Sequence, residues 1–313
     1  MSSARAPQIV ERSESAGSVA AAKGPRAVTD ASEVRHPLFR TLWYTVNILL
    51  LLSIFGVLWC SAWEYSTRRY LKGFSDAIVP FSASPVQKIQ SILNWMSRNP
   101  ARTGEAPGGL SGDRDPTDTL NYASLLSVCG TATNAFVNLA DTAGLSTRRL
   151  LLLDSRDSTM HVVAEVLVDG RWIVVDPTFR TILRASDGSM VTRDDLATPA
   201  VFAAATSRIV GYNPAYTYGH SVHIRVARFG LPGRIGGRIL DAVAPNWQGS
   251  PFVSLIVERE SLSATILSTL VALLLILLRT SLRWYGESRL AIRSDRIRDK
   301  LRRLGHLLLE PAD

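Results

Sequence analysis

The chain has 313 residues, which allows one or two domains, and 46% of them are hydrophobic, so a sizeable core can form. It carries 35 basic and 27 acidic residues, for a formal net charge of +8. Only two cysteines occur, one of them inside an apolar run, which excludes both a disulfide within a soluble domain and a thiolate metal cluster.

The N-terminal part reads as a tail followed by a membrane span. We expect residues 1–40 to be a disordered cytoplasmic tail, because they are rich in Ala, Ser, Arg and Glu and lack apolar periodicity. The first thirty residues contain no apolar stretch, so we do not expect a secretory signal peptide. Residues 41–63 are uncharged and long enough to cross a bilayer, with Trp and Tyr at both ends as interface anchors; a buried core helix is the alternative. Asn47, the strongly polar residue inside this run, is expected to face a partner helix.

Three segments connect the first span to the region of Cys129. Residues 64–84 are interpreted as a juxtamembrane linker. Residues 85–98 repeat apolar side chains at helical spacing and predict a helix. Residues 99–119 are loaded with Pro, Gly, Asp and Arg, which indicates a loop bordering a functional groove.

Cys129 is the first candidate for chemistry. The residues after it show one apolar helical face, and Gly144 stands where a C-cap glycine belongs, so Cys129 is predicted at a helix N-terminus. Free N–H groups and the positive end of the helix dipole lower a thiol pKa there, and the thiolate is the nucleophile. Gly130 and the upstream Asn121 and Tyr122 are candidate donors to a substrate or an oxyanion.

His161 and Asp176 are the second pair of candidates. Residues 161–168 and 171–176 flank Asp169-Gly170, the signal of a two-residue hairpin. In that register His161 and Asp176 lie on one face as diagonal neighbours, about 7–8 Å apart at Cβ. One bulge would place them on opposite faces.

Each of these residues has a simpler interpretation when taken alone. A lone cysteine is usually a small buried hydrophobe, a lone histidine a satisfied core or surface residue, and an Asp before Pro a turn cap. Their order, spacing and hairpin parity together favour a thiol nucleophile, a histidine base and a carboxylate that orients the base.

A family resemblance rests on Cys129-Gly130, His161, and Trp172 with Asp176-Pro177-Thr178. This pattern, over about residues 85–179, resembles the transglutaminase-like superfamily, which has the papain-like cysteine peptidase fold. The resemblance implies an α+β domain with N-terminal helices packed on an antiparallel sheet, and a catalytic triad of Cys129, His161 and Asp176. The family often has an aromatic residue at the position of Val163, so this substitution is expected to reshape the substrate groove, while Glu165 keeps the family's glutamate.

The domain is expected to occupy residues 85–260, including a C-terminal extension. Thr192 and Asp195 predict a capping-box start of a helix. Residues 222–229 alternate in polarity and are interpreted as a strand whose His223 faces solvent.

The C-terminal part reads as a second span and a basic tail. Residues 261–278 are uncharged, at the lower end of what crosses a bilayer. Residues 279–313 predict a basic amphipathic cytoplasmic tail, whose natural partner is anionic headgroups; nucleic acid is disfavoured because the charge abuts a span. The excess of basic residues after the second span predicts that both termini lie inside the cell and that the domain is extracytoplasmic, on the inner or plasma membrane. Arg68, Arg69 and Lys72, at the other end of the first span, favour the opposite orientation.

The sequence thus predicts a membrane-anchored cysteine-dependent amide hydrolase or acyltransferase, acting on peptide or glutamine-type amides of a peptide or protein substrate, without metal or cofactor. Hydrolysis is favoured slightly, because nothing marks an amine site. The alternative is a catalytically silent transglutaminase-like binding or scaffold protein in a cell-envelope assembly. A metal-dependent hydrolase using His161, His220 and His223 ranks last, since their spacing matches no zinc pattern.

Overall fold

The computed structural model describes residues 37–98, 102–103, 115–226 and 230–290. The predicted disorder before residue 37 and the part of the basic tail after residue 290 lie outside these residues. The chain divides into two compact units, one spanning Val46–Thr280 and the other combining the two flanking ends.

The helices are α1 (Pro37–Ile78), α2 (Pro85–Arg98), α3 (Pro116–Asn121), α4 (Ala123–Leu126), α5 (Cys129–Thr142), α6 (Arg193–Leu196), α7 (Pro199–Thr206), α8 (Gly230–Val243), the 3-10 helix η2 (Trp247–Gly249), α9 (Pro251–Glu258) and α10 (Glu260–Arg289). The strands are β1 (Thr147–Leu153), β2 (Thr159–Val168), β3 (Arg171–Asp176), β4 (Thr181–Ile182) and β5 (Ser221–Val222). They form one antiparallel sheet in the order β4-β3-β2-β1-β5. The predicted α+β class is confirmed.

The β2–β3 hairpin has the predicted register, with Val168 opposite Arg171. Its two turn residues, Asp169 and Gly170, have φ of 50° and 78°, the left-handed conformation that an Asp-Gly turn adopts readily. The pairing continues without a bulge to Ala164 opposite Val175. Side chains of β2 and β3 therefore keep the alternation on which the placement of His161 and Asp176 depends.

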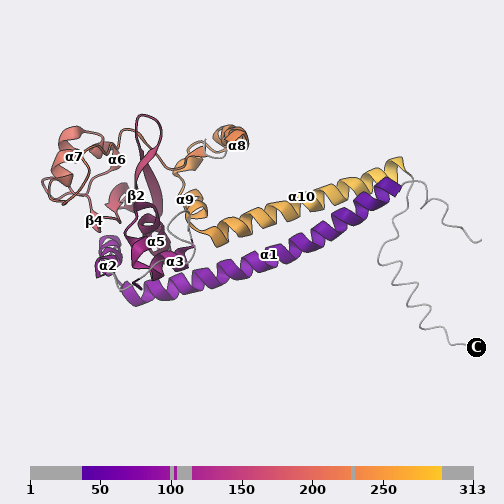
Figure 1. The fold of residues 1–313 in the computed structure, drawn as a ribbon, viewed down its shortest axis with the longest axis horizontal. Helices are drawn as coiled ribbons and strands as arrows, with labels where there is room; N and C mark the ends of the chain where they lie inside the picture. Colours follow the sequence, from indigo (N-terminus) through magenta and orange to yellow (C-terminus); the bar gives the residue numbers. More distant parts are fainter. Residues whose placement is uncertain (1–36, 99–101, 104–114, 227–229, 291–313) are drawn as a thin grey trace, which may run out of the picture. The chain divides into compact units, whose positions relative to one another are not determined.

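The two larger apolar cores lie on the two faces of the sheet. On one face α5 packs against β2 and β1, and α2 packs on α5, as Figure 1 shows. Phe136, Ala164 and Val175 belong to this core. On the other face α6 and α7 cover Val163 and Val174. The second half of β1, residues 150–153, is a run of four buried leucines, as expected where a strand is covered on both faces.

The interpretation of residues 64–84 as a linker is wrong. Helix α1 continues to Ile78, and Leu71 is fully buried in the core that α5 forms with the sheet. Phe74 and Ile78 pack against the same core, so Leu71, Phe74 and Ile78 form an apolar stripe at helical spacing. This stripe holds the second half of α1 as part of the folded domain.

The strand predicted over residues 222–229 is also wrong for residues 223–226, and residues 227–229 lie outside the described residues. Strand β5 ends at Val222, which pairs with Leu151. His223 leaves the ladder and bonds to the buried Glu165 of β2 through its Nε2, 2.8 Å from the carboxylate. A buried carboxylate outcompetes strand pairing here, so His223 is not a solvent-facing strand residue.

Helices α1 and α10 are long and apolar enough to cross a membrane. Their most apolar windows are only 6% and 11% buried, which disfavours the buried core helix that the sequence left open. Asn47 accepts a hydrogen bond from Arg279 Nε at 2.8 Å, so its expected partner helix is the second apolar helix of the same chain. In the smaller unit, Gly286 leaves room for the ring of Phe39, which a Cβ would meet at 2.7 Å.

A buried arginine joins the start of α10 to α1 and α5. Arg259 is 2% exposed and bonds to Glu64 at 3.2 Å, Asp141 at 3.1 Å and Asn138 at 2.8 Å. Ser261 donates to the other oxygen of Glu64 at 2.6 Å. A charge this deeply buried persists only with such partners, and here they lock three helices together.

Candidate active site

Cys129 is the first residue of α5, as predicted. The N-cap residue is Val128, whose side chain makes no capping hydrogen bond, so the first-turn N–H groups are left without the usual side-chain acceptor. Thr133, one turn further, donates to the carbonyl of Val162 at 3.0 Å and fixes α5 to β2 beside His161. The helix therefore presents the thiol and the N–H groups of its first turn at the end of the sheet.

His161 and Asp176 are in direct contact, which confirms the predicted pairing. His161 Nε2 lies 2.7 Å from Asp176 Oδ2, and both side chains are buried. The other carboxylate oxygen, Oδ1, accepts the backbone N–H groups of Thr178 at 3.0 Å and Phe179 at 3.2 Å. Because Nε2 is engaged by the carboxylate, Nδ1 is the imidazole nitrogen left for the thiol.

The thiol and the imidazole shift each other's pKa. The contact with His161 lowers the pKa of Cys129 against the opposing effect of burial, and the backbone of Val162 and Gly130 adds weaker hydrogen bonds. Burial lowers the pKa of His161, but its hydrogen bonds to Asp176 and Cys129 outweigh burial and raise it to about 9. Each group therefore favours the charged form of the other, thiolate and imidazolium.

Aromatic side chains enclose the imidazole, two of them from the segment after α7 and one from the loop after β3. The ring of Tyr216 stacks on His161 with centroids 4.5 Å apart and an interplanar angle of 2°. Tyr212 and Phe179 approach edge-on at 6.2 and 6.0 Å. Tyr212 bonds to Tyr218 at 2.8 Å, and burial raises the pKa of Tyr212 well above its usual range, so its hydroxyl stays a neutral donor beside Asp176. The clustering of Tyr212, Tyr216 and Tyr218 in the sequence was the signal for this wall, but nothing local pointed it at His161.

Arg180 is a further residue that sequence reasoning missed. Its guanidinium donates to the carbonyls of Thr178 at 2.7 Å and Leu126 at 2.6 Å, and also to that of Pro177. It thereby ties the loop after Asp176 to the segment just before Cys129. The φ of Arg180 is 56°, a conformation that costs a non-glycine residue energy and that these contacts sustain.

The three candidate oxyanion donors are placed differently. The backbone of Gly130 bonds to the Cys129 sulfur. The carboxamide of Asn121 is engaged elsewhere: Nδ2 donates to Thr117 O at 2.6 Å, and Oδ1 accepts from Tyr70 at 3.4 Å. Tyr122 is the residue between α3 and α4, and its N–H donates to Asp118 O. The geometry thus favours the first turn of α5 over Asn121 and Tyr122.

The other two histidines within the described residues, His220 and His223, pair with separate carboxylates. Burial is the largest single effect on the pKa of Glu165 and raises it. The bonds from His223 and Arg148 add up to more than this effect, so the pKa of Glu165 is lowered. His220 lies 3.1 Å from the exposed Asp157. Within the described residues no three His, Cys, Asp or Glu side chains gather as a metal would require.

Val163 does not line a groove. It is fully buried in the core that α6 and α7 form with the sheet, beside Leu150 and Val174. The small side chain at this position therefore fits the packing of that core, and the expectation that it reshapes the substrate groove is wrong.

A family model for the transglutaminase-like superfamily matches residues 72–177, about a third of the chain. Residues 72–177 form a transglutaminase-like domain. The match begins inside α1 and ends one residue after Asp176, so it contains Cys129, His161 and Asp176. Members of this superfamily are commonly enzymes with a papain-like fold. No curated protein and no solved structure gave a significant match to the chain.

Proposed function

We propose that the protein is a membrane-anchored, cysteine-dependent acyl-transfer enzyme, with Cys129 as nucleophile, His161 as general base and acid, and Asp176 as the residue that orients His161. One observation carries the proposal: the imidazole is buried between a carboxylate at 2.7 Å and a thiol on a helix N-terminus whose pKa it lowers. A histidine with a purely structural role is satisfied by one hydrogen-bond partner. His161 instead contacts both a carboxylate and a thiol, which is the arrangement of a general base that activates a nucleophile.

The chemistry follows from this arrangement. The Cys129 thiolate attacks the carbonyl carbon of an amide, a C–S bond forms, and the negative charge moves to the carbonyl oxygen. The uncapped N–H groups at the start of α5 are the donors available to that oxyanion. As the C–N bond breaks, the His161 imidazolium gives its proton to the leaving amine and a thioester remains on Cys129.

The second half of the reaction releases the thioester. Neutral His161 takes a proton from water or from an amine, whose oxygen or nitrogen attacks the thioester carbon and expels the Cys129 thiolate. Water gives hydrolysis and an amine gives a transferred acyl group. Asp176 keeps Nε2 protonated throughout, which leaves Nδ1 free to exchange the proton. Peptide or protein amides, including glutamine-type side chains, are the proposed substrates.

The membrane is the second part of the proposal. The low burial of the apolar windows of α1 and α10 supports two spans, and the basic tail supports a cytoplasmic location for both termini. The domain then faces the extracytoplasmic side of the inner or plasma membrane. Apolar side chains of Trp59 and Trp63, 68% and 37% exposed, lie where α1 would leave the hydrocarbon.

A peptidyl acyloxymethyl ketone, which alkylates activated thiolates at the position of an amide carbonyl, tests the proposal on the full chain in detergent. The wild type and a Cys60→Ala control are expected to be labelled at Cys129, and Cys129→Ala to be unlabelled. Peptides from digested membrane proteins are then incubated with the enzyme and a fluorescent primary amine. Incorporation of the amine indicates acyl transfer, and cleavage without incorporation indicates hydrolysis. Equal labelling of the Cys129→Ala variant, or labelling at Cys60 alone, would leave a scaffold protein as the better account.

A further inference from the structure

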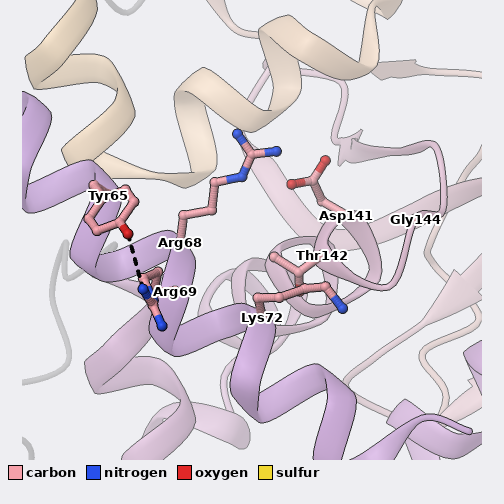
Figure 2. Close-up of a pocket in the computed structure, with 7 residues that line it drawn as sticks. All are labelled: Tyr65, Arg68, Arg69, Lys72, Asp141, Thr142 and Gly144. Carbon is pink, nitrogen blue, oxygen red and sulfur yellow. Dashed lines mark hydrogen bonds between the residues drawn. The ribbon is translucent and has the colours of Figure 1, made fainter. Parts of the chain in front are cut away.

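A hollow of about 490 Å³ lies away from Cys129, between the second half of α1 and the C-terminal end of α5. Its walls are Tyr65, Arg68, Arg69, Lys72, Asp141, Thr142 and Gly144, and we call it the basic pocket. Figure 2 shows the Arg68 side chain reaching across from α1 toward Asp141, with Lys72 extending past Thr142. Two helices that are distant in sequence thus build one cationic recess.

The three cations of the basic pocket are only weakly neutralised by the protein. Arg69 donates a hydrogen bond to the hydroxyl of Tyr65 at 3.0 Å, which is not an ion pair with a carboxylate. Lys72 pairs with Asp76, but both side chains are more than half exposed, where such pairs contribute little. Arg68 is exposed, and the described residues give it no hydrogen-bond or ion-pair partner. The acidic wall residue, Asp141, is already bonded to the buried Arg259.

The basic pocket begins at the outer edge of the headgroup region if α1 spans the bilayer. With a rise of about 1.5 Å per residue, Arg68 lies roughly 7.5 Å and Lys72 roughly 13.5 Å beyond Trp63, where the uncharged run ends. The headgroup region extends some 5–8 Å beyond the hydrocarbon on each side, so Arg68 stands at its outer edge and Lys72 several ångströms past it. Long, flexible side chains of this kind can reach back toward a phosphate at that edge. These cations also stand at the end of the span where the positive-inside bias disfavours them, so membrane insertion does not account for them.

We propose that the basic pocket binds the phosphate of an anionic phospholipid in the extracytoplasmic leaflet. This inference rests on the membrane placement proposed above and is independent of the thiol chemistry. Two guanidinium groups and an ammonium group match a phosphate, since arginine presents paired donors and lysine a point charge. A lipid bound there contacts both α1 and the end of α5, the helix that begins with Cys129, and so sets the orientation of the domain against the bilayer.

The test uses the full chain in nanodiscs of phosphatidylcholine with a fixed share of phosphatidylglycerol. Native mass spectrometry after mild detergent extraction counts the phosphatidylglycerol retained. The test variant combines Arg68→Gln, Arg69→Gln and Lys72→Gln. The matched control removes three exposed arginines elsewhere in the domain, Arg156→Gln, Arg184→Gln and Arg208→Gln. The basic tail is present in all three proteins, so its own lipids cancel in the comparison.

The wild type and the control are expected to retain phosphatidylglycerol over phosphatidylcholine, and the test variant to lose this preference by on the order of 100-fold, from three basic groups near the surface. Arg68→Gln alone breaks no ion pair seen in the structure and should lose roughly 5-fold without affecting folding. Equal retention by the wild type and the test variant would overturn the proposal.

Two further measurements separate the sources of the phosphate and the failures of the two proposals. Inorganic phosphate and soluble glycerophosphate are added as competitors; displacement of the lipid only at concentrations far above that of the lipid supports a headgroup site, whereas tight binding of free phosphate with no lipid preference would overturn it. Labelling of Cys129 by the ketone probe should be unchanged in the test variant. Loss of membrane association in the wild type would instead contradict the anchoring on which the inference rests.

Discussion

Asp176→Asn tests how the carboxylate controls His161. The substitution replaces one carboxylate oxygen with an NH2 group of similar size and removes the negative charge. Both oxygens of Asp176 are in use: Oδ2 contacts His161, and Oδ1 accepts from the N–H groups of Thr178 and Phe179. An asparagine has one carbonyl oxygen. In one orientation its NH2 faces the Nε2–H of His161, and in the other it faces two backbone N–H donors. Either the imidazole changes tautomer, which puts a proton on Nδ1 against the thiol, or the loop after β3 loses its acceptor.

The size of the effect follows from the electrostatics of His161. Raising its pKa from an ordinary 6.5 to about 9 corresponds to roughly 3 kcal/mol in favour of the imidazolium, and the hydrogen bond to Asp176 is the largest favourable cause. Without the carboxylate, burial is opposed only by Cys129, so the pKa of His161 should fall to its ordinary value or below. Because the folded-state pKa is raised, the stability contributed by protonated His161 is complete below about pH 6.5 and is lost as the pH rises through about 9.

The assay is an NMR titration of the His161 ring in the full chain in micelles, with turnover of an amide identified by the labelling experiment measured in parallel. The wild type should titrate near pH 9 and the variant at or below about pH 6.5. Turnover should fall by up to about 10⁴, the loss seen for the equivalent change in a Ser–His–Asp enzyme. The exposed Asp187→Asn is the control. An unchanged titration of His161 with wild-type turnover would refute the role assigned to Asp176.

Three further predictions follow from separate contacts. Arg180→Gln should lower turnover at least tenfold with a smaller loss at Arg180→Lys, because the guanidinium holds the loop after Asp176 to the segment before Cys129, and kcat of the two variants checks this. Arg259→Ala should lower the free energy of unfolding by about 1–3 kcal/mol, since it removes the hydrogen-bond partner of the partly exposed Glu64 and Asp141. The exposed Arg184→Ala should change it by less than about 0.5 kcal/mol, and denaturant melts measure both. Alkaline phosphatase fused after Ala83 should be active and fused after Arg303 inactive, and the reverse pattern would contradict the proposed topology.

The features that local patterns determine were predictable. The hairpin at Asp169-Gly170 fixes its own register, and register alone decides that His161 and Asp176 share a face. The α5 start at Cys129 and the Gly144 that follows its C-cap, with φ of 81°, follow equally from local chemistry.

The features set by contacts distant in sequence were not predictable. The Tyr216 ring on His161 and the Arg180 bond to Leu126 each join segments more than fifty residues apart. The end of α1 looked like a linker because its charged residues hide the apolar stripe that begins at Leu71. His223 left its expected strand because a buried carboxylate on β2 needs a partner, and no local pattern encodes that need.

The most direct test of the central claim is the rate of iodoacetamide alkylation at Cys129 across pH, resolved from Cys60 by mass spectrometry, in the wild type and in His161→Ala. The contact with His161 lowers the thiol pKa, so the wild-type midpoint should lie below about 8.5, the pKa of an ordinary thiol. Removing the imidazole should move the midpoint up toward that value. The same midpoint near 8.5 in both proteins would show that His161 does not activate Cys129, and would contradict the account of this site as a cysteine-dependent enzyme.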